Sequence, residues 1–155
     1  MKRFMNYTIA ATFLAAAATA QQQSSVTIDG HAIHITYAAP TAKNRVAASF
    51  QTAANLAFKG VSVPQGEYTV YVLADGPQWQ LAINKAAGAK AAVYDPKLDL
   101  GRINMTAVKA PAPIAGCKIV LTKIAAMAAQ LEVSWNDTVA TVPFHLDRGG
   151  SDSEW

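Results

Sequence analysis

The chain has 155 residues, of which 15% are charged, and it contains a single cysteine. Its formal net charge of +3 is too small to indicate a nucleic-acid-binding protein. The lone Cys117 cannot form a disulfide within the chain, and its apolar neighbours favour a small core residue over a nucleophile.

Residues 1–20 are typical of a secretory signal peptide. Lys2 and Arg3 give a positive start, Thr8–Ala18 is apolar and uncharged, and small residues precede the expected cleavage after Ala20. A transmembrane anchor is the alternative, but the uncharged run is too short to cross a bilayer comfortably. We therefore expect a periplasmic or secreted protein with no transmembrane span after cleavage.

Cleavage leaves 135 residues and a formal net charge of +1, because two basic residues are lost with the signal. A chain of this length fits one domain with its own core. We assign residues 26–146 to that domain, with a loose polar lead-in at 21–25 and a disordered tail at 147–155.

The first expected element is a hairpin around an Asp29-Gly30 turn. The two-residue turn places Ile28 opposite His31. One face of the hairpin is then apolar, and it comprises Val26, Ile28, Ile33, Ile35 and Tyr37. The following segment, Val46–Phe58, is rich in alanine and shows no clean apolar stripe, so we expect a loop and a short strand there.

The best-specified element is a second hairpin over Val63–Asn84. Glu67–Leu73 consists almost entirely of β-branched, aromatic and aliphatic residues, which is typical of a central strand covered on both faces. Ala74–Pro77 is dense in turn-forming residues. From Trp79 onward, large apolar residues alternate with polar or small ones, which predicts the returning strand.

The second half of the chain contains short strands separated by turns, expected at Ala92–Tyr94, Arg102–Val108, Cys117–Ile124, Leu131–Trp135 and Val139–Leu146. Asp95 is a good N-cap and Pro96 suits the first helical position, so one helical turn is expected before Gly101. Ala110–Pro113 is expected to be a stiff crossover. The whole pattern predicts an all-β antiparallel sandwich or flattened barrel of eight to nine strands.

Several blocks of the mature chain, taken in order, resemble a known family. They are Pro64–Tyr68, Trp79–Lys85, Tyr94–Arg102, Leu131–Trp135 and Val142–Phe144. Together they resemble the exported bacterial domain-of-unknown-function family number twenty-nine-eleven (DUF2911), from Val26 to Leu146. The resemblance implies a single exported β domain and lends no activity, because the family has no established one.

The chain departs from the family pattern at three charged positions. Ala39 stands where the pattern has Arg, Gln51 stands where it has a second Arg, and Leu56 stands where it has Glu. The segments before Phe50 and after Phe58 also look shortened. If the charged groups form a site in other members, this chain resembles a divergent member without that site.

The three histidines are the first candidates for metal ligands. His31 and His34 are an odd number of positions apart, so they face opposite sides of one strand. His145 alternates with apolar residues and is expected to point outward. No acid stands at ligand spacing, and no glycine-rich phosphate loop occurs, so we expect surface histidines, no metal and no cofactor.

One polar cluster stands out, and no motif for covalent catalysis accompanies it. Its members lie at strand ends and in the helical turn, where functional groups are commonly carried: Asn84, Lys85, Tyr94, Asp95, Asp99 and Arg102. One interpretation is a ligand or partner site. The alternative is that these groups cap and brace the connection. Trp79 and Trp135 are expected to anchor the core rather than to stack on sugars.

Three functions remain open. The first is a non-catalytic exported sandwich that binds a protein, a small ligand or an envelope surface. The second is an envelope hydrolase or lyase that uses Asp95, Asp99 and Arg102. The third is a structural scaffold whose alanine-rich edges pair with another chain. We favour the first, because the sequence contains no catalytic constellation.

Overall fold

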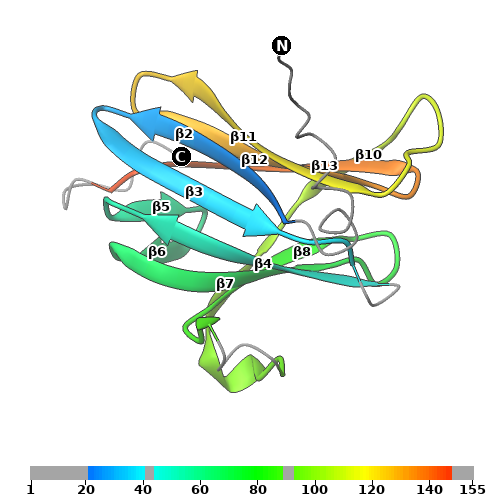
Figure 1. Cartoon of the computed structure of the whole chain (residues 1–155), viewed down its shortest axis with the longest axis horizontal. Helices are drawn as coiled ribbons and strands as arrows, with labels where there is room; N and C mark the ends of the chain where they lie inside the picture. The colour runs from blue at the N-terminus through cyan, green and yellow to red at the C-terminus, as the bar shows by residue number, and fades with distance from the viewer. Residues whose placement is uncertain (1–20, 41–43, 89–92, 148–155) are drawn as a thin grey trace, which may run out of the picture.

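The computed structural model describes residues 21–40, 44–88 and 93–147, which form two antiparallel sheets packed face to face (Figure 1). The expected signal peptide, and the expected tail from residue 148 onward, lie outside the described residues. Within the described part of the chain, no helix is long and apolar enough to cross a membrane.

The first sheet has six strands in the order β2-β3-β4-β7-β8-β9. Their bounds are Gln22–Ile28 for β2, His31–Tyr37 for β3, Arg45–Thr52 for β4, Gly66–Leu73 for β7, Gln80–Asn84 for β8 and Asp99–Asn104 for β9. A 3-10 turn, η3 (Pro96–Leu98), immediately precedes β9.

The second sheet runs β11-β12-β13-β5-β6, and β10 also pairs with β13. The bounds are Leu56–Phe58 for β5, Val61–Val63 for β6, Thr106–Lys109 for β10, Cys117–Ala125 for β11, Ala128–Trp135 for β12 and Thr138–Leu146 for β13. One edge of β13 is therefore shared, with β10 opposite its first half and β5 opposite its end.

The predicted all-β sandwich is confirmed, and it is not a closed barrel. The described residues contain twelve strands instead of the expected eight to nine. Both hairpins are confirmed: Ile28 pairs with His31 in the first, and β7 pairs with β8 in the second. As expected, β7 is central, with β4 on its other side.

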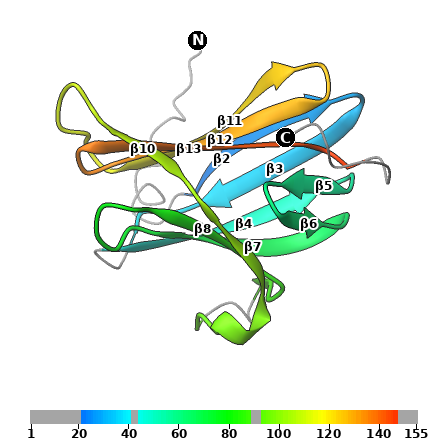
Figure 2. The same ribbon diagram turned by 180° about the vertical axis from the view of Figure 1, so that it is seen from behind.

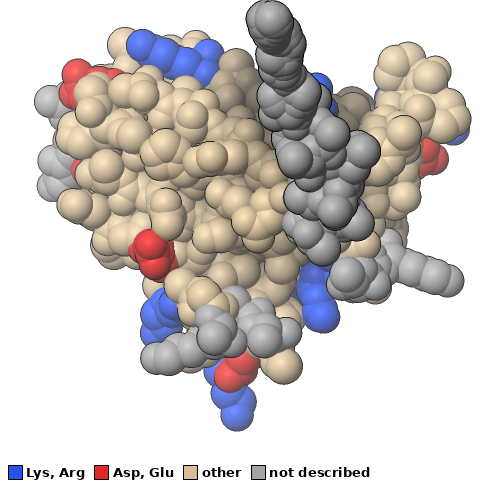
Figure 3. Space-filling view, viewed as in Figure 1, with Lys and Arg blue, Asp and Glu red and all other residues tan. Residues whose placement is uncertain are grey.

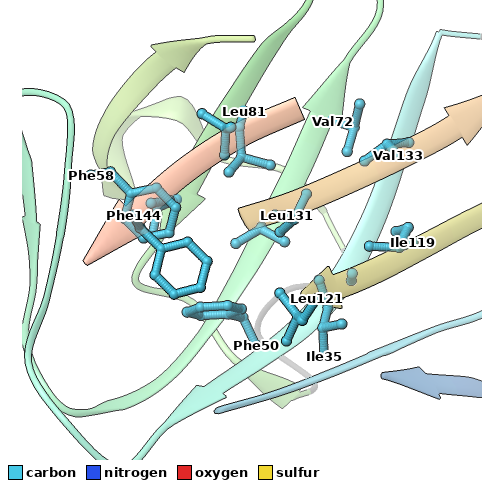
Figure 4. Close-up of a cluster of buried hydrophobic side chains, with 14 of the residues drawn as sticks. Ile35, Phe50, Phe58, Val72, Leu81, Ile119, Leu121, Leu131, Val133 and Phe144 are labelled. Carbon is cyan, nitrogen blue, oxygen red and sulfur yellow. The ribbon is translucent and has the colours of Figure 1, made fainter. Parts of the chain in front are cut away.

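The core fills the space between the sheets with aromatic and branched side chains (Figure 4). Phe50 of the first sheet makes edge contacts with Phe58 and Phe144 of the second, whose rings stack at 4.8 Å between centroids. Trp79 and Trp135 are both buried and meet edge to face at 6.0 Å. The prediction that these tryptophans anchor the core is confirmed.

The expected loop after Val46 is wrong, because Arg45–Thr52 is a full strand with burial that alternates at every residue. Alanine and polar residues occupy most of its positions, and their low strand propensity hid the period of two. Pairing with β3 on one side and β7 on the other stabilises the strand regardless of that propensity. The same segment also contains a short strand, β5, at its end.

Two smaller expectations also need correction. The lead-in at 21–25 is not loose, because β2 begins at Gln22 and its polar residues pair with β3 through the backbone. The strand expected at Ala92–Tyr94 is wrong: Val93 and Tyr94 are not in a strand, and Ala92 lies outside the described residues. The expected helical turn after Asp95 is confirmed as a 3-10 turn, with the Asp95 side chain as its N-cap.

The expected single strand over Arg102–Val108 is in fact two strands that belong to different sheets. β9 pairs with β8, and after the buried Met105 the chain continues as β10 on β13 (Figure 2). The alternation of inward and outward residues runs through Met105 without a break, so the sequence gives no sign of the change. The crossover is therefore at Met105, whereas Ala110–Pro113 links β10 and β11 within one sheet.

The two sides of the sandwich are joined in different ways. On the β2 side, the Tyr37 hydroxyl accepts the backbone N–H of Ile119 and the Ser24 hydroxyl accepts that of Leu121, each at 2.9 Å. On the β9 side, Gly101 lies directly against Val61 of β6, and a Cβ at this glycine would be 2.5 Å from a Val61 methyl. No larger residue fits at position 101 without a shift of Val61.

Candidate functional site

The predicted polar cluster lies where β8 ends and β9 begins, below the sandwich in Figure 1. Asn84 is the last residue of β8, and the pairing register with β9 shifts between Ile83 and Asn84. The chain then leaves the sheet and returns through η3. On the side seen in Figure 3, charged side chains gather around this lower end, whereas the face over β3 carries few.

Asn84 is the buried centre of the cluster, with no solvent exposure. Its amide nitrogen donates to the Asp95 backbone carbonyl and to Asp99 Oδ1, both at 2.9 Å. Its amide oxygen accepts the Ala86 N–H at 2.9 Å. A buried amide of this kind needs all of its partners, because an unsatisfied polar group costs about 1–3 kcal/mol. Asn84 therefore fixes both ends of the loop to β8.

Both carboxylate oxygens of Asp99 are engaged within the cluster. Oδ1 accepts from Asn84, while Oδ2 accepts the Tyr94 hydroxyl at 2.6 Å and Arg102 Nε at 3.3 Å. The Asp99 side chain is 9% exposed, whereas that of Arg102 is 42% exposed. The carboxylate thus faces into the cluster, and the guanidinium extends outward from it.

Tyr94 connects the cluster to the outer face of the first sheet. Its ring packs on Tyr71 at 4.4 Å between centroids, and the Arg45 guanidinium lies 5.5 Å from the ring centre. Burial first, and then the hydrogen bond to Asp99, raise the pKa of Tyr94 above its ordinary value. The Tyr94 hydroxyl also accepts a 2.9 Å bond from Arg102 Nη2, which is the largest cause of the raised pKa of Arg102.

The structure brings four of the six predicted residues together through their side chains: Asn84, Tyr94, Asp99 and Arg102. The Asp95 side chain accepts the Lys97 N–H instead, and its link to Asn84 is through its backbone carbonyl. Lys85 contributes its backbone N–H to the Leu98 carbonyl. Tyr71 and Arg45 also contact Tyr94, and the sequence does not predict this because both are distant in the chain and are brought there by sheet pairing.

The arrangement is that of a brace. Both carboxylate oxygens of Asp99 accept hydrogen bonds within the cluster, and Asp95 Oδ1 accepts one from η3. The other oxygen of Asp95 belongs to an exposed side chain. No imidazole, thiol or second carboxylate faces Asp99 in the described contacts. These groups hold a loop and orient an arginine, which is what the bracing interpretation predicts.

The histidines occupy separate positions. His34 faces Ser25 across the hairpin, as expected, and its Nδ1 lies 3.4 Å from Gln23 Nε2. His145 Nδ1 lies 2.9 Å from the Leu146 carbonyl. Across the described ranges, no group of three or more His, Cys, Asp or Glu side chains is placed to hold a metal ion. Cys117 is buried, and burial raises the pKa of its thiol to about 11.

The three positions that depart from the family pattern do not share one environment. Leu56 is fully buried in the core, whereas Gln51 is on the exposed face of β4 and donates to Glu67 Oε2 at 2.8 Å. Ala39 is exposed just beyond β3. Gln51 lies between His34 and Glu67 in one row across β3, β4 and β7, at a shallow hollow of about 340 Å³.

A polar groove of about 680 Å³ adjoins the cluster. It follows the crossing segment from Arg102 to Ala107, and Lys59 of the β5–β6 turn lines it as well. Phe58 pairs with Phe144 and Thr106 pairs with Thr141, so the Lys59 turn and the start of β10 approach each other along one edge of β13. The groove thus lies between the Lys59 turn and the crossing segment, and Arg102 belongs to both the groove and the cluster.

A model of the family described as "Protein of unknown function (DUF2911)" matches residues 45–144. The chain belongs to the DUF2911 family. The DUF2911 match runs from β4 into β13 and includes the whole cluster and groove, while β2 and β3 precede it. The predicted family resemblance is confirmed. No curated protein and no solved structure matches the chain.

Proposed function

We propose that this DUF2911 protein is an exported, non-catalytic domain that binds a ligand or partner at the β9 side of its sandwich. One observation carries the proposal. Both oxygens of Asp99 are used to hold the cluster together, while Arg102 of the same cluster lines an open groove. A catalytic acid or base needs reach to a substrate proton, whereas a binding site needs a positioned donor.

The hydrogen bonds that hold the Arg102 side chain in place support a binding role. Asp99 and Tyr94 each accept from one nitrogen of the guanidinium. Tyr94 itself contacts the Tyr71 ring and the Arg45 guanidinium. A side chain that is fixed in this way loses little conformational freedom when a ligand arrives. The β2 side argues against a scaffold that pairs with another chain through its strand edges. Two backbone N–H groups of the β11 edge already donate to Tyr37 and Ser24, so they are not open to a partner strand.

The proposal is tested by nuclear magnetic resonance titration of the ¹⁵N-labelled mature chain with a library of small sugars, amino acids, phosphates and carboxylates. Ligand-induced shifts are expected at Lys59 and along 102–107. Hydrolytic turnover that Asp99→Asn abolishes while the circular dichroism spectrum is retained would contradict the non-catalytic role. Shifts confined to the row of His34, Gln51 and Glu67 would place binding elsewhere.

Export is the second part of the proposal. β2 begins at Gln22, two residues after Ala20, so cleavage at the expected position leaves all described strands intact. The test is expression of the full chain in a bacterium, followed by intact mass measurement. The expected product lacks residues 1–20 and is found in the periplasm or medium. A full-length product retained in the cytoplasm would contradict export.

A further inference from the structure

We infer that the groove beside Arg102 is a binding site for a small oxyanion, a carboxylate or a phosphate ester. The inference rests on the proposed binding function and names its ligand class. Six polar side chains line the groove, and no Asp or Glu is among the lining residues: Lys59, Gln78, Gln80, Arg102, Asn104 and Thr106. The site therefore combines two cations with amides and a hydroxyl.

The amides are arranged so that donors remain for a ligand. Gln80 Nε2 donates to Asn104 Oδ1 at 2.9 Å, which leaves the Asn104 amide nitrogen without an acceptor among the described residues. Gln78 Nε2 donates to the carbonyls of Trp79 and Met105, both at 3.0 Å, and is thereby fixed against the strand. The Asn104 amide nitrogen therefore offers the kind of N–H donor that an oxyanion requires.

The two cations stand on different segments. Arg102 uses Nε and one N–H of Nη2 within the cluster, so Nη1 and the second N–H of Nη2 remain for a ligand. Lys59 is exposed at the β5–β6 turn, and its ammonium has no ion pair or hydrogen bond with the described part of the chain. Asp99 offsets part of the Arg102 charge, but its carboxylate is turned into the cluster, away from most solvent.

The volume of about 680 Å³ lies within the range of small-molecule sites, about 300–1,000 Å³. A groove between Lys59 and Arg102 suits a ligand that carries more than one oxyanion oxygen, because each cation can then meet a different acceptor. Charge-assisted hydrogen bonds of this kind depend on ionic strength, so added salt is expected to weaken binding.

The test is a ¹H–¹⁵N titration of the mature chain with three probes: inorganic phosphate, citrate and neutral methyl glucoside. Phosphate or citrate is expected to shift the amides of Lys59, Asn104 and Thr106, and methyl glucoside is expected to leave them unchanged. Lys59→Met is expected to lower the affinity for the anion about tenfold, which corresponds to the loss of one charge-assisted hydrogen bond. The matched control Lys118→Met, on the outer face of β11, is expected to leave affinity unchanged.

Tyr94→Phe separates the effect of orienting the Arg102 guanidinium from the effect of its charge on anion affinity. It removes the hydroxyl that accepts from Arg102 Nη2 but keeps the ring on Tyr71. A smaller loss of affinity than for Arg102→Met is expected. Binding of methyl glucoside at the groove without either anion would overturn the ligand class and leave the binding function standing. Absence of any ligand at the groove, with binding elsewhere, would overturn the site itself.

Discussion

The two sides of the sandwich are closed by different means. On the β2 side, the hydroxyls of Tyr37 and Ser24 accept backbone N–H groups of β11. On the β9 side, the chain itself crosses between the sheets at Met105, and Gly101 packs against Val61. In the first arrangement, side-chain hydroxyls occupy backbone N–H groups on the edge of β11. The second leaves a polar groove next to a braced arginine, so the β9 side is where we place function.

The largest effect is expected from Asn84→Ala on the β9 side. The change removes three hydrogen bonds of a buried side chain at about 1 kcal/mol each, so the free energy of unfolding should fall by about 3 kcal/mol. Urea unfolding measures this. The exposed Asn104→Ala serves as control and should cost less than about 0.5 kcal/mol. Equal losses for both variants would contradict the bracing role of Asn84.

Gly101→Ala tests the close approach on the same side. The new Cβ would be 2.5 Å from a Val61 methyl, and overpacking of this kind costs about 1–3 kcal/mol. Thermal and urea unfolding report the loss. Adding Val61→Ala should recover part of it, since the clashing methyl groups are gone. Additive losses in the double variant would show that the contact does not limit residue size.

Tyr37→Phe tests the β2 side. The buried Ile119 N–H would lose its acceptor, and the expected cost is about 1–2 kcal/mol in urea unfolding. Ser24→Ala should cost less, because its bond to Leu121 is only partly buried. Hydrogen exchange at Ile119 should accelerate in Tyr37→Phe. Unchanged exchange there would show that the hydroxyl does not protect this edge.

Cys117, the first residue of β11, makes the β2 side sensitive to alkaline pH. Burial raises the pKa of its thiol from 9.0 to about 11, so the unfolded chain ionises first and stability falls as pH rises. Between pH 9 and 10 we expect a loss of about 1 kcal/mol. Cys117→Ser should flatten this slope.

A thiol reagent at pH 8 should label the native protein slowly and the unfolded protein fast. Equal labelling rates would contradict the burial of Cys117.

The smallest stability effect is expected from Arg102→Met. The Arg102 side chain is 42% exposed, and exposed ion pairs contribute less than about 1 kcal/mol. Urea unfolding should therefore change little while anion affinity at the groove falls. A loss of stability as large as that of Asn84→Ala would make Arg102 part of the brace rather than a ligand-binding group.

Local pattern was sufficient for the elements whose partners are adjacent in the chain. The Asp29-Gly30 hairpin, the β7–β8 hairpin and the Asp95 cap each depend on neighbouring residues, and each was predicted correctly. β4 was not, because its strand form depends on β3 and β7 rather than on its own composition.

The candidate site shows the same division. Asn84, Tyr94, Asp99 and Arg102 are close in sequence, and their side chains contact one another in the structure. Lys59 is not predicted from the sequence, because the pairing of β5 with β13 and the packing of β6 against β9 bring it to the groove. Such long-range pairing is not encoded in any single window of sequence.

The shared edge of β13 also constrains when the domain can fold. β5 precedes three strands of the first sheet in the chain, and β10 follows the last of them. Both pair with β13, which is the last of the described strands. The second sheet is therefore incomplete until the C-terminal strand has left the ribosome. Contacts of such long sequence separation form slowly. Delayed folding of this kind suits a chain that, as we propose, is threaded through a membrane before it folds.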